Sequence, residues 1–173
     1  MSSSTKPGCV SGFLLLLFFL TLSGCSKEAV KPSEDNVKIR AVLAFVNRLK
    51  QTYEAKDQSG LLSLVSSDSA LASSLPQVLA RDFQSFDQIK LAPTVDRIEL
   101  GKGKMTVVIN WDGQWQNGNN QPVYKEKGTT ILNLKDSPAI QLVDLSGDPL
   151  FGAAARVAQT APASPGASNL LNP

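Results

Sequence analysis

The chain has 173 residues, enough for one domain of ordinary size. Hydrophobic residues make up 42% and charged residues 18%, which argues against a disordered acidic chain and against a coiled coil. The formal net charge is only +2, and the sequence contains no histidine. The small net charge argues against nucleic-acid binding through charge alone. The absence of histidine excludes histidine-based triads and argues against most catalytic zinc sites.

The N-terminal segment contains a short apolar run, residues 13–22, followed by Ser23, Gly24 and Cys25. A helix that spans a bilayer needs about 20 apolar residues, so a run of ten has the length of a signal-peptide core. A plain secretory signal with an incidental cysteine, or a short core helix, is the alternative interpretation.

The tetrad Leu22-Ser23-Gly24-Cys25 resembles the lipobox of bacterial lipoproteins. The resemblance implies that residues 1–24 are a signal peptide, that Cys25 receives acyl chains such as palmitate, and that the protein is anchored in a membrane of the cell envelope. Because Ser26 follows the cysteine, the resemblance also implies an outer-membrane location facing the periplasm. The other cysteine, Cys9, lies in the segment that would be removed, so we expect no disulfide in the mature chain.

Composition divides the rest of the chain into three parts. Residues 25–35 are polar and are expected to form a lipidated tether, and residues 36–152 are expected to fold as one domain. Residues 153–173 are rich in Ala, Ser, Pro and Gly with Arg156 as the single charge, so we expect a disordered tail.

The first half of the domain has a helical period. Apolar residues at positions 39, 42, 43, 46, 49 and 53 predict a long first helix, and the leucines at 61–64 predict a short second one. A third helix is predicted from Ser74, the expected N-cap, through the apolar positions 75, 78, 79, 83, 86 and 89, with Pro93 ending the helical region.

The second half changes to a period of two. Strands are predicted at 94–100, 104–115, 123–135 and 139–145, separated by short connections such as Gly101-Lys102-Gly103. Three short connections in a row indicate a four-stranded antiparallel meander. We therefore predict an α+β fold with the N-terminal helices packed on one face of a curved sheet.

This order of elements, together with the helix end Tyr53-Glu-Ala-Lys-Asp57, resembles the nuclear transport factor 2-like (cystatin-like) superfamily. The resemblance covers about residues 36–151 and implies a sheet that bends into a cone around a helix. Some members catalyse inside the cone, as ketosteroid isomerases and dehydratases do, and others only bind or dimerise. The fold alone does not choose among these functions.

Three residues are candidates for ligand binding: Tyr53, Trp111 and Trp115. Tyr53 either points into the cone or packs as an ordinary helix residue. The two tryptophans share the strand face of Met105, Val107 and Ile109, and either form a stacking platform or continue the core. From this register we expect Trp111 to be the more buried indole and Trp115 to stay partly open at the mouth of the cone.

No catalytic residue is assigned from the sequence. Asp82 and Asp87 lie beside Arg81 and Lys90 in the third predicted helix, where surface ion pairs are the simpler interpretation. Asp144 and Asp148 do not make a metal site, and neither a glycine-rich phosphate loop nor a Walker lysine is present, so we expect no metal and no cofactor. Leu150 and Phe151 are expected to fold back as an apolar plug.

The sequence therefore favours a non-enzymatic envelope lipoprotein that binds a small ligand or a protein partner in the periplasm, without nucleic acid. One alternative is an enzyme of the isomerase or dehydratase type that uses the cone. Another is a structural accessory that forms a homodimer through its exposed sheet.

Overall fold

A computed structural model describes residues 33–118, 121–136 and 139–160. Within these residues, helices precede and follow one sheet. The elements in chain order are α2 (Glu34–Glu54), α3 (Gln58–Leu62), α4 (Leu71–Ser85), β1 (Gln88–Leu100), β2 (Lys104–Gln116), β3 (Tyr124–Asp136), β4 (Ile140–Gly147) and α5 (Ala153–Thr160). None of the described helices has the length and apolar character that a membrane-spanning segment needs.

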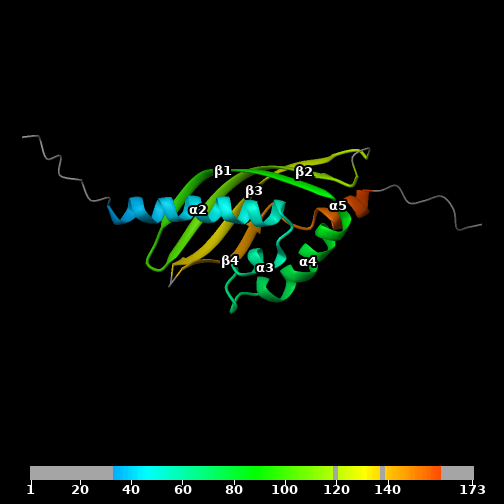
Figure 1. Cartoon of the computed structure of the whole chain (residues 1–173). Helices are drawn as coiled ribbons and strands as arrows, with labels where there is room; N and C mark the ends of the chain where they lie inside the picture. The colour runs from blue at the N-terminus through cyan, green and yellow to red at the C-terminus, as the bar shows by residue number, and fades with distance from the viewer. Residues whose placement is uncertain (1–32, 119–120, 137–138, 161–173) are drawn as a thin grey trace, which may run out of the picture. The chain divides into compact units, whose positions relative to one another are not determined.

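Helix α2 lies along one face of the sheet (Figure 1). The Ser33 side chain accepts a hydrogen bond from the Asn36 backbone and caps the helix, whose first turn carries Glu34 and Asp35. The helix thus begins two residues before the expected domain boundary at residue 36. Its buried residues recur every three to four positions and face the sheet: Val42, Phe45, Val46, Leu49 and Tyr53.

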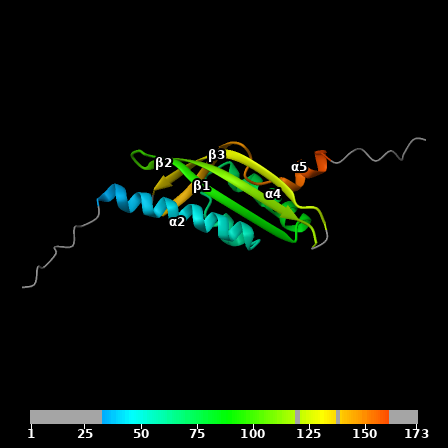
Figure 2. The ribbon, with the colours of Figure 1, turned by 90° about the horizontal axis from the view of Figure 1, so that it is seen from above.

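The sheet is an antiparallel meander in the order β1-β2-β3-β4, with register shifts in β1 and between β3 and β4. Helices α2, α3 and α4 lie on the same side of it, which confirms the predicted α+β architecture (Figures 1 and 2). The predicted face of β2 is also confirmed, because Met105, Val107, Ile109, Trp111 and Trp115 are all buried. The residues between them are exposed or half-buried, except Val108 and Gly113, which are buried.

The boundary between helix and sheet differs from the sequence prediction. Helix α4 begins at Leu71, before Ser74, and ends at Ser85, and β1 already begins at Gln88. Pro93, expected to end a helix, lies inside β1, which is an edge strand that can accommodate a residue without an N–H donor. Ile89 and Leu91 are buried in β1 with a period of two. The sequence analysis had wrongly assigned Ile89 to the apolar stripe of the third helix.

The C-terminal segment also differs from the prediction. Residues 153–160 form α5, so the expected disordered tail is wrong for these eight residues; residues 161–173 lie outside the described part of the chain. Ala153 and Ala154 are buried, and α5 packs beside α4 (Figure 2). The Ala154 N–H donates to the Asp82 carboxyl at 2.9 Å, so a side chain of α4 caps the start of α5. Small apolar side chains and this cap stabilise a helix in a segment that its composition alone predicted to be disordered.

One apolar core joins the helices to the inner face of the sheet. As predicted, Leu150 and Phe151 are buried in it as a plug after β4. Its fully buried large side chains are Trp115, Tyr53, Leu49, Leu61, Leu79, Leu91, Ile109, Leu132, Leu134, Leu142, Leu150 and Val42.

Deleting residues 153–173 should destabilise the domain, because the deletion removes the buried alanines and a hydrogen-bond donor of Asp82. We expect a loss of about 2–4 kcal/mol and a fall in Tm of about 10 °C, measured by circular dichroism. The control is a chain that ends at Thr160, which keeps α5 and should melt within a few degrees of the full chain. Equal melting of the two truncated chains would show that α5 contributes nothing to stability.

Candidate functional site

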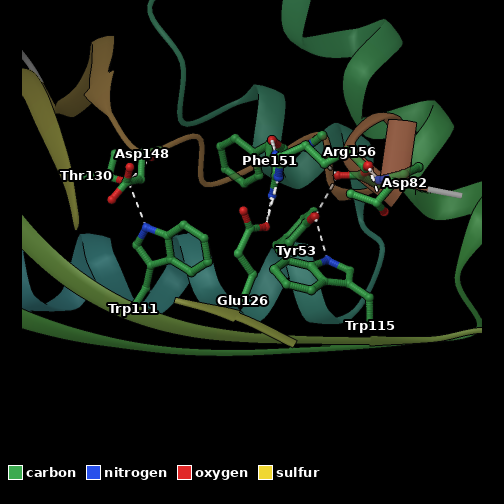
Figure 3. A network of polar contacts seen from close by, with 12 residues as sticks. Tyr53, Asp82, Trp111, Trp115, Glu126, Thr130, Asp148, Phe151 and Arg156 are labelled. Carbon is green, nitrogen blue, oxygen red and sulfur yellow. Dashed lines mark hydrogen bonds and ion pairs between the residues drawn. The ribbon is translucent and has the colours of Figure 1, made fainter. Parts of the chain in front are cut away.

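Side chains from three helices, the sheet and the β4–α5 connection meet between α2 and the inner face of the sheet (Figure 3). We call this group the interior cluster. Its members are Tyr53, Asp82, Trp111, Trp115, Glu126, Phe151 and Arg156.

Tyr53 connects α2 to both α4 and the sheet. Its hydroxyl donates to Asp82 Oδ2 at 2.7 Å and accepts from Trp115 Nε1 at 3.1 Å, and its ring packs edge-on against Phe151 at 5.0 Å. Burial raises the pKa of Tyr53 above its ordinary value, and the neighbouring Asp82 carboxylate raises it further. The phenol is therefore a neutral hydrogen-bond donor at physiological pH, as a packed helix residue requires.

Asp82 is the residue that the sequence analysis placed wrongly. It was expected to form a surface ion pair, yet it is fully buried. Oδ2 accepts from the Tyr53 hydroxyl and, at 2.7 Å, from the Gly152 N–H, and Oδ1 accepts from the Ala154 N–H. The signal was present in the sequence, because Asp82 lies three and seven residues after Leu79 and Leu75, on the buried stripe of α4.

The two tryptophans lie on the inner face, but not as expected. Trp115 is 0% exposed and Trp111 is 3% exposed, so the prediction that Trp115 stays partly open is wrong. A Cβ atom at Gly113 would overlap the Trp115 indole, which shows that the ring folds back over the space that this glycine leaves. The two indoles then meet edge-to-face at 6.4 Å.

Trp111 has a polar partner of its own. Its Nε1 donates to the Thr130 hydroxyl at 2.8 Å, and that hydroxyl donates to the Asp148 carbonyl at 2.5 Å. Both indole N–H groups are thus satisfied inside the domain, and neither ring offers a face to solvent as a stacking platform.

An ion pair that the sequence analysis missed lies between the two indoles in the view of Figure 3. Glu126 points inward from β3, and Arg156 reaches it from α5, with Nε at 2.8 Å and Nη2 at 2.7 Å from Glu126 Oε2. Arg156 also donates to the Phe151 carbonyl at 2.7 Å. Alternation along β3 could have found Glu126, because it shares a face with Tyr124 and Thr130.

Among the described residues, no group of three or more acidic or cysteine side chains could hold a metal ion. Both inward carboxyl groups, Asp82 and Glu126, are engaged in bonds that hold α5 against the rest of the domain. In the described part of the chain, the inward polar groups are thus bonded to neighbouring elements, and we call this arrangement the closed interior. Cys25, the predicted lipidation site, lies outside the described residues.

A separate depression of about 340 Å³ lies on the opposite face of the sheet. Its lining residues come from β1, β2 and β3: Ala92, Thr94, Asn110, Trp111, Asp112, Lys127, Gly128 and Thr129. Apart from Trp111 and Gly128, these residues alternate with the core residues and are exposed.

No protein-family model matches the chain, and no curated protein sequence matches it. Solved structures do. The Kfla4162 protein from Kribbella flavida aligns with a TM-score of 0.60 at 12% identity, over 71% of this chain and 99% of that one. A candidate dehydratase of the NTF2-like family from Streptomyces avermitilis aligns with a TM-score of 0.57 at 12% identity, over 66% and 97%. A ketosteroid isomerase-like protein from Erwinia carotovora atroseptica aligns with 0.53 at 13%, over 66% and 99%.

The chain has the nuclear transport factor 2-like fold. The expectation from element order is thereby confirmed for the fold. Sequence identities this low support the fold and not a shared function. In this nuclear transport factor 2-like domain, Tyr53, Trp111, Trp115 and Phe151 occupy the inside of the bent sheet.

Replacing Trp115 by alanine should destabilise the domain by about 3–5 kcal/mol, because a fully buried indole and its hydrogen bond are lost. Trp111→Ala should cost a similar amount. Denaturant unfolding measures both, with Val123→Ala, a change at an exposed position, as the control. In the native protein, acrylamide should quench neither indole strongly; strong quenching of Trp115 would contradict the closed interior.

Tyr53 should make the domain sensitive to alkaline pH. Its raised pKa means that stability is complete below about pH 10, where the unfolded phenol is neutral, and falls as the pH rises toward the higher folded value. Between about pH 9 and pH 11, Tyr53→Phe should therefore lose less stability than the native chain. At lower pH it should already be weaker by about 1 kcal/mol for the missing hydrogen bond.

The matched control for this experiment is Tyr124→Phe, which removes the other tyrosine of the sequence. Its alkaline loss of stability, followed by denaturant unfolding, should equal that of the native chain. Identical pH profiles for all three proteins would contradict the burial of the Tyr53 hydroxyl.

Proposed function

We propose that the chain is a lipid-anchored protein of the bacterial cell envelope whose domain binds a ligand or partner at its surface and is not an enzyme. The observation that supports it best is the state of the interior cluster, in which the inward acids and the tyrosine are hydrogen-bonded to neighbouring elements. Catalytic groups need access to substrate, and these groups hold the domain closed.

Membrane anchoring is supported by the lipobox-like tetrad that ends at Cys25. Several acyl chains on one cysteine hold a protein at a bilayer without a basic helper segment. The outer-membrane location, facing the periplasm, is supported by Ser26, the residue that follows the tetrad.

An enzyme of the isomerase or dehydratase type is the second candidate. It is favoured by the candidate dehydratase and the ketosteroid isomerase-like protein among the similar structures, and by the hydrogen-bonded pair of Tyr53 and Asp82 in the interior. Such activity would require α5 and Phe151 to leave the interior, since both contact this pair. A homodimeric accessory is the third candidate.

Replacing Cys25 by alanine should release the protein from the membrane fraction or leave it unprocessed, because no acyl chain can be attached. Mass spectrometry of the native mature protein should show an acylated Cys25 at the N-terminus. A native mature chain without acyl groups would end the anchoring proposal. The matched control is Cys9→Ala, which should be processed normally, since Cys9 lies in the predicted signal peptide.

A capture experiment distinguishes surface binding from catalysis. The lipidated protein is recovered from native membranes, and bound proteins and small molecules are identified by mass spectrometry. Tyr53→Phe keeps the surface unchanged, so capture should be unaffected. An enzyme that uses the interior would instead bind a small molecule that this variant loses.

A further inference from the structure

We propose that the outward face of β1, β2 and β3 binds a short stretch of an acidic glycan, with the saccharide hydroxyls over the depression and a sugar carboxylate between Lys90 and Lys125. This inference deepens the proposed surface-binding function by naming the class of ligand. It concerns the face that carries no helix in the described part of the chain.

The floor of the depression consists of polar side chains that can hydrogen-bond to hydroxyl groups. Thr94, Asn110 and Thr129 lie in one row across three strands, because Thr94 is registered with Asn110 and Asn110 with Thr129. The Thr129 hydroxyl donates to Asn110 Oδ1 at 2.7 Å, which leaves the two N–H donors of that amide directed away from this bond. Fixed amide donors beside hydroxyl groups match the alternating donors and acceptors of a sugar ring.

The next row adds an ordered ion pair. Asp112 is registered with Ala92 on one side and Lys127 on the other, and Lys127 Nζ lies 2.6 Å from Asp112 Oδ1. The second carboxylate oxygen of Asp112 remains available as an acceptor. Ala92 in this row has a small side chain, which leaves space above the sheet and contributes to the depression.

One row further along lie two lysines that have no carboxylate partner in the described part of the chain. Lys90 and Lys125 flank Gln114, one on each neighbouring strand, and both are exposed. Neither forms an ion pair with a described carboxylate. Their Cα atoms are about 10 Å apart across β2, so both ammonium groups can reach one carboxylate placed above Gln114.

The composition of this face selects a glycan over other anions. The centre of a protein interface is usually rich in aromatic residues and poor in lysine, whereas the outward residues of these rows are Lys, Gln, Asp, Asn, Thr and Ala. Over these rows β2 is paired on both sides, with β1 and with β3, so the centre of the face offers side chains and not backbone groups to a peptide. A nucleic acid needs about six to ten phosphate contacts for strong binding, more than Lys90, Lys125 and the paired Lys127 supply.

Titration calorimetry with the full chain in detergent tests the assignment. The probe is tetragalacturonate, an oligosaccharide with one carboxylate on each sugar, compared with neutral maltotetraose and with tetraglutamate. We expect tetragalacturonate to bind measurably and both other probes to bind at least tenfold more weakly. Binding of tetraglutamate as tight as that of the acidic sugar would assign the face to acidic peptides and overturn the proposal.

Two pairs of variants locate the site. The double variant Lys90→Gln, Lys125→Gln should weaken tetragalacturonate binding about tenfold, the sum of two exposed charge contacts. The control Lys102→Gln, Lys104→Gln makes the same change of charge about 30 Å away along β2 and should bind normally. Asn110→Ala should also weaken binding, whereas Asn47→Ala on the exposed side of α2 should not.

Equal loss in both double variants would mean attraction by net charge only, and would overturn the site. Absence of binding to tetragalacturonate would overturn the ligand class while leaving the anchor and the closed interior intact, because these are judged by Cys25 acylation and tryptophan quenching. Conversely, if the native mature chain carried no acyl groups but still bound the probe through Lys90 and Lys125, the anchor would be refuted and the glycan site kept.

Discussion

A single buried carboxyl group, that of Asp82, holds the helical part of this domain together. Taking a carboxylate out of water costs several kcal/mol unless hydrogen bonds replace its hydration. Here the Tyr53 hydroxyl and two backbone N–H groups supply those bonds, and they come from α2, from Gly152 and from α5. Each donor belongs to a different part of the chain, so the cost of burying Asp82 is met only when all three are in place. Gly152 suits the position because its φ of +85° is strained for other residues.

The closed interior follows from this arrangement. With α5 fixed by Asp82, Arg156 reaches Glu126 across the end of the sheet, and Phe151 is pressed edge-on against Tyr53. The side chains that an open cone would offer to a ligand become the contacts that keep the last helix in position. The outward face of the sheet is not used by these contacts, and it carries a depression of its own.

Periodic hydrophobic patterns predicted most of the fold. The predictions were wrong where long-range contacts of individual residues, such as Asp82, determine the structure. The period-two alternation of β2 was sufficient to place its inner face, and the plug of Leu150 and Phe151 was expected. Asp82 was misplaced because a charged residue beside Arg81 suggests a surface pair, although its spacing from Leu79 favours burial. Helix α5 was missed because alanines and one arginine give a weak hydrophobic signal, and the cap that orders the helix comes from a residue 72 positions earlier. Contacts of that range cannot be read from local composition.

The same register that buries the tryptophans also determines the outward surface. Trp115 packs over Gly113 and Trp111 over Gly128, so both indoles depend on glycines at fixed positions of the sheet. A slip of one residue would bring lysine and aspartate inward and expose both indoles, at a cost of several kcal/mol. Asn110, Asp112 and Gln114 must therefore point outward, in line with Thr94, Lys127 and Lys125 on the neighbouring strands. The polar rows are thus held rigidly by the core beneath them, and a ligand that matches them meets side chains whose positions were fixed when the domain folded.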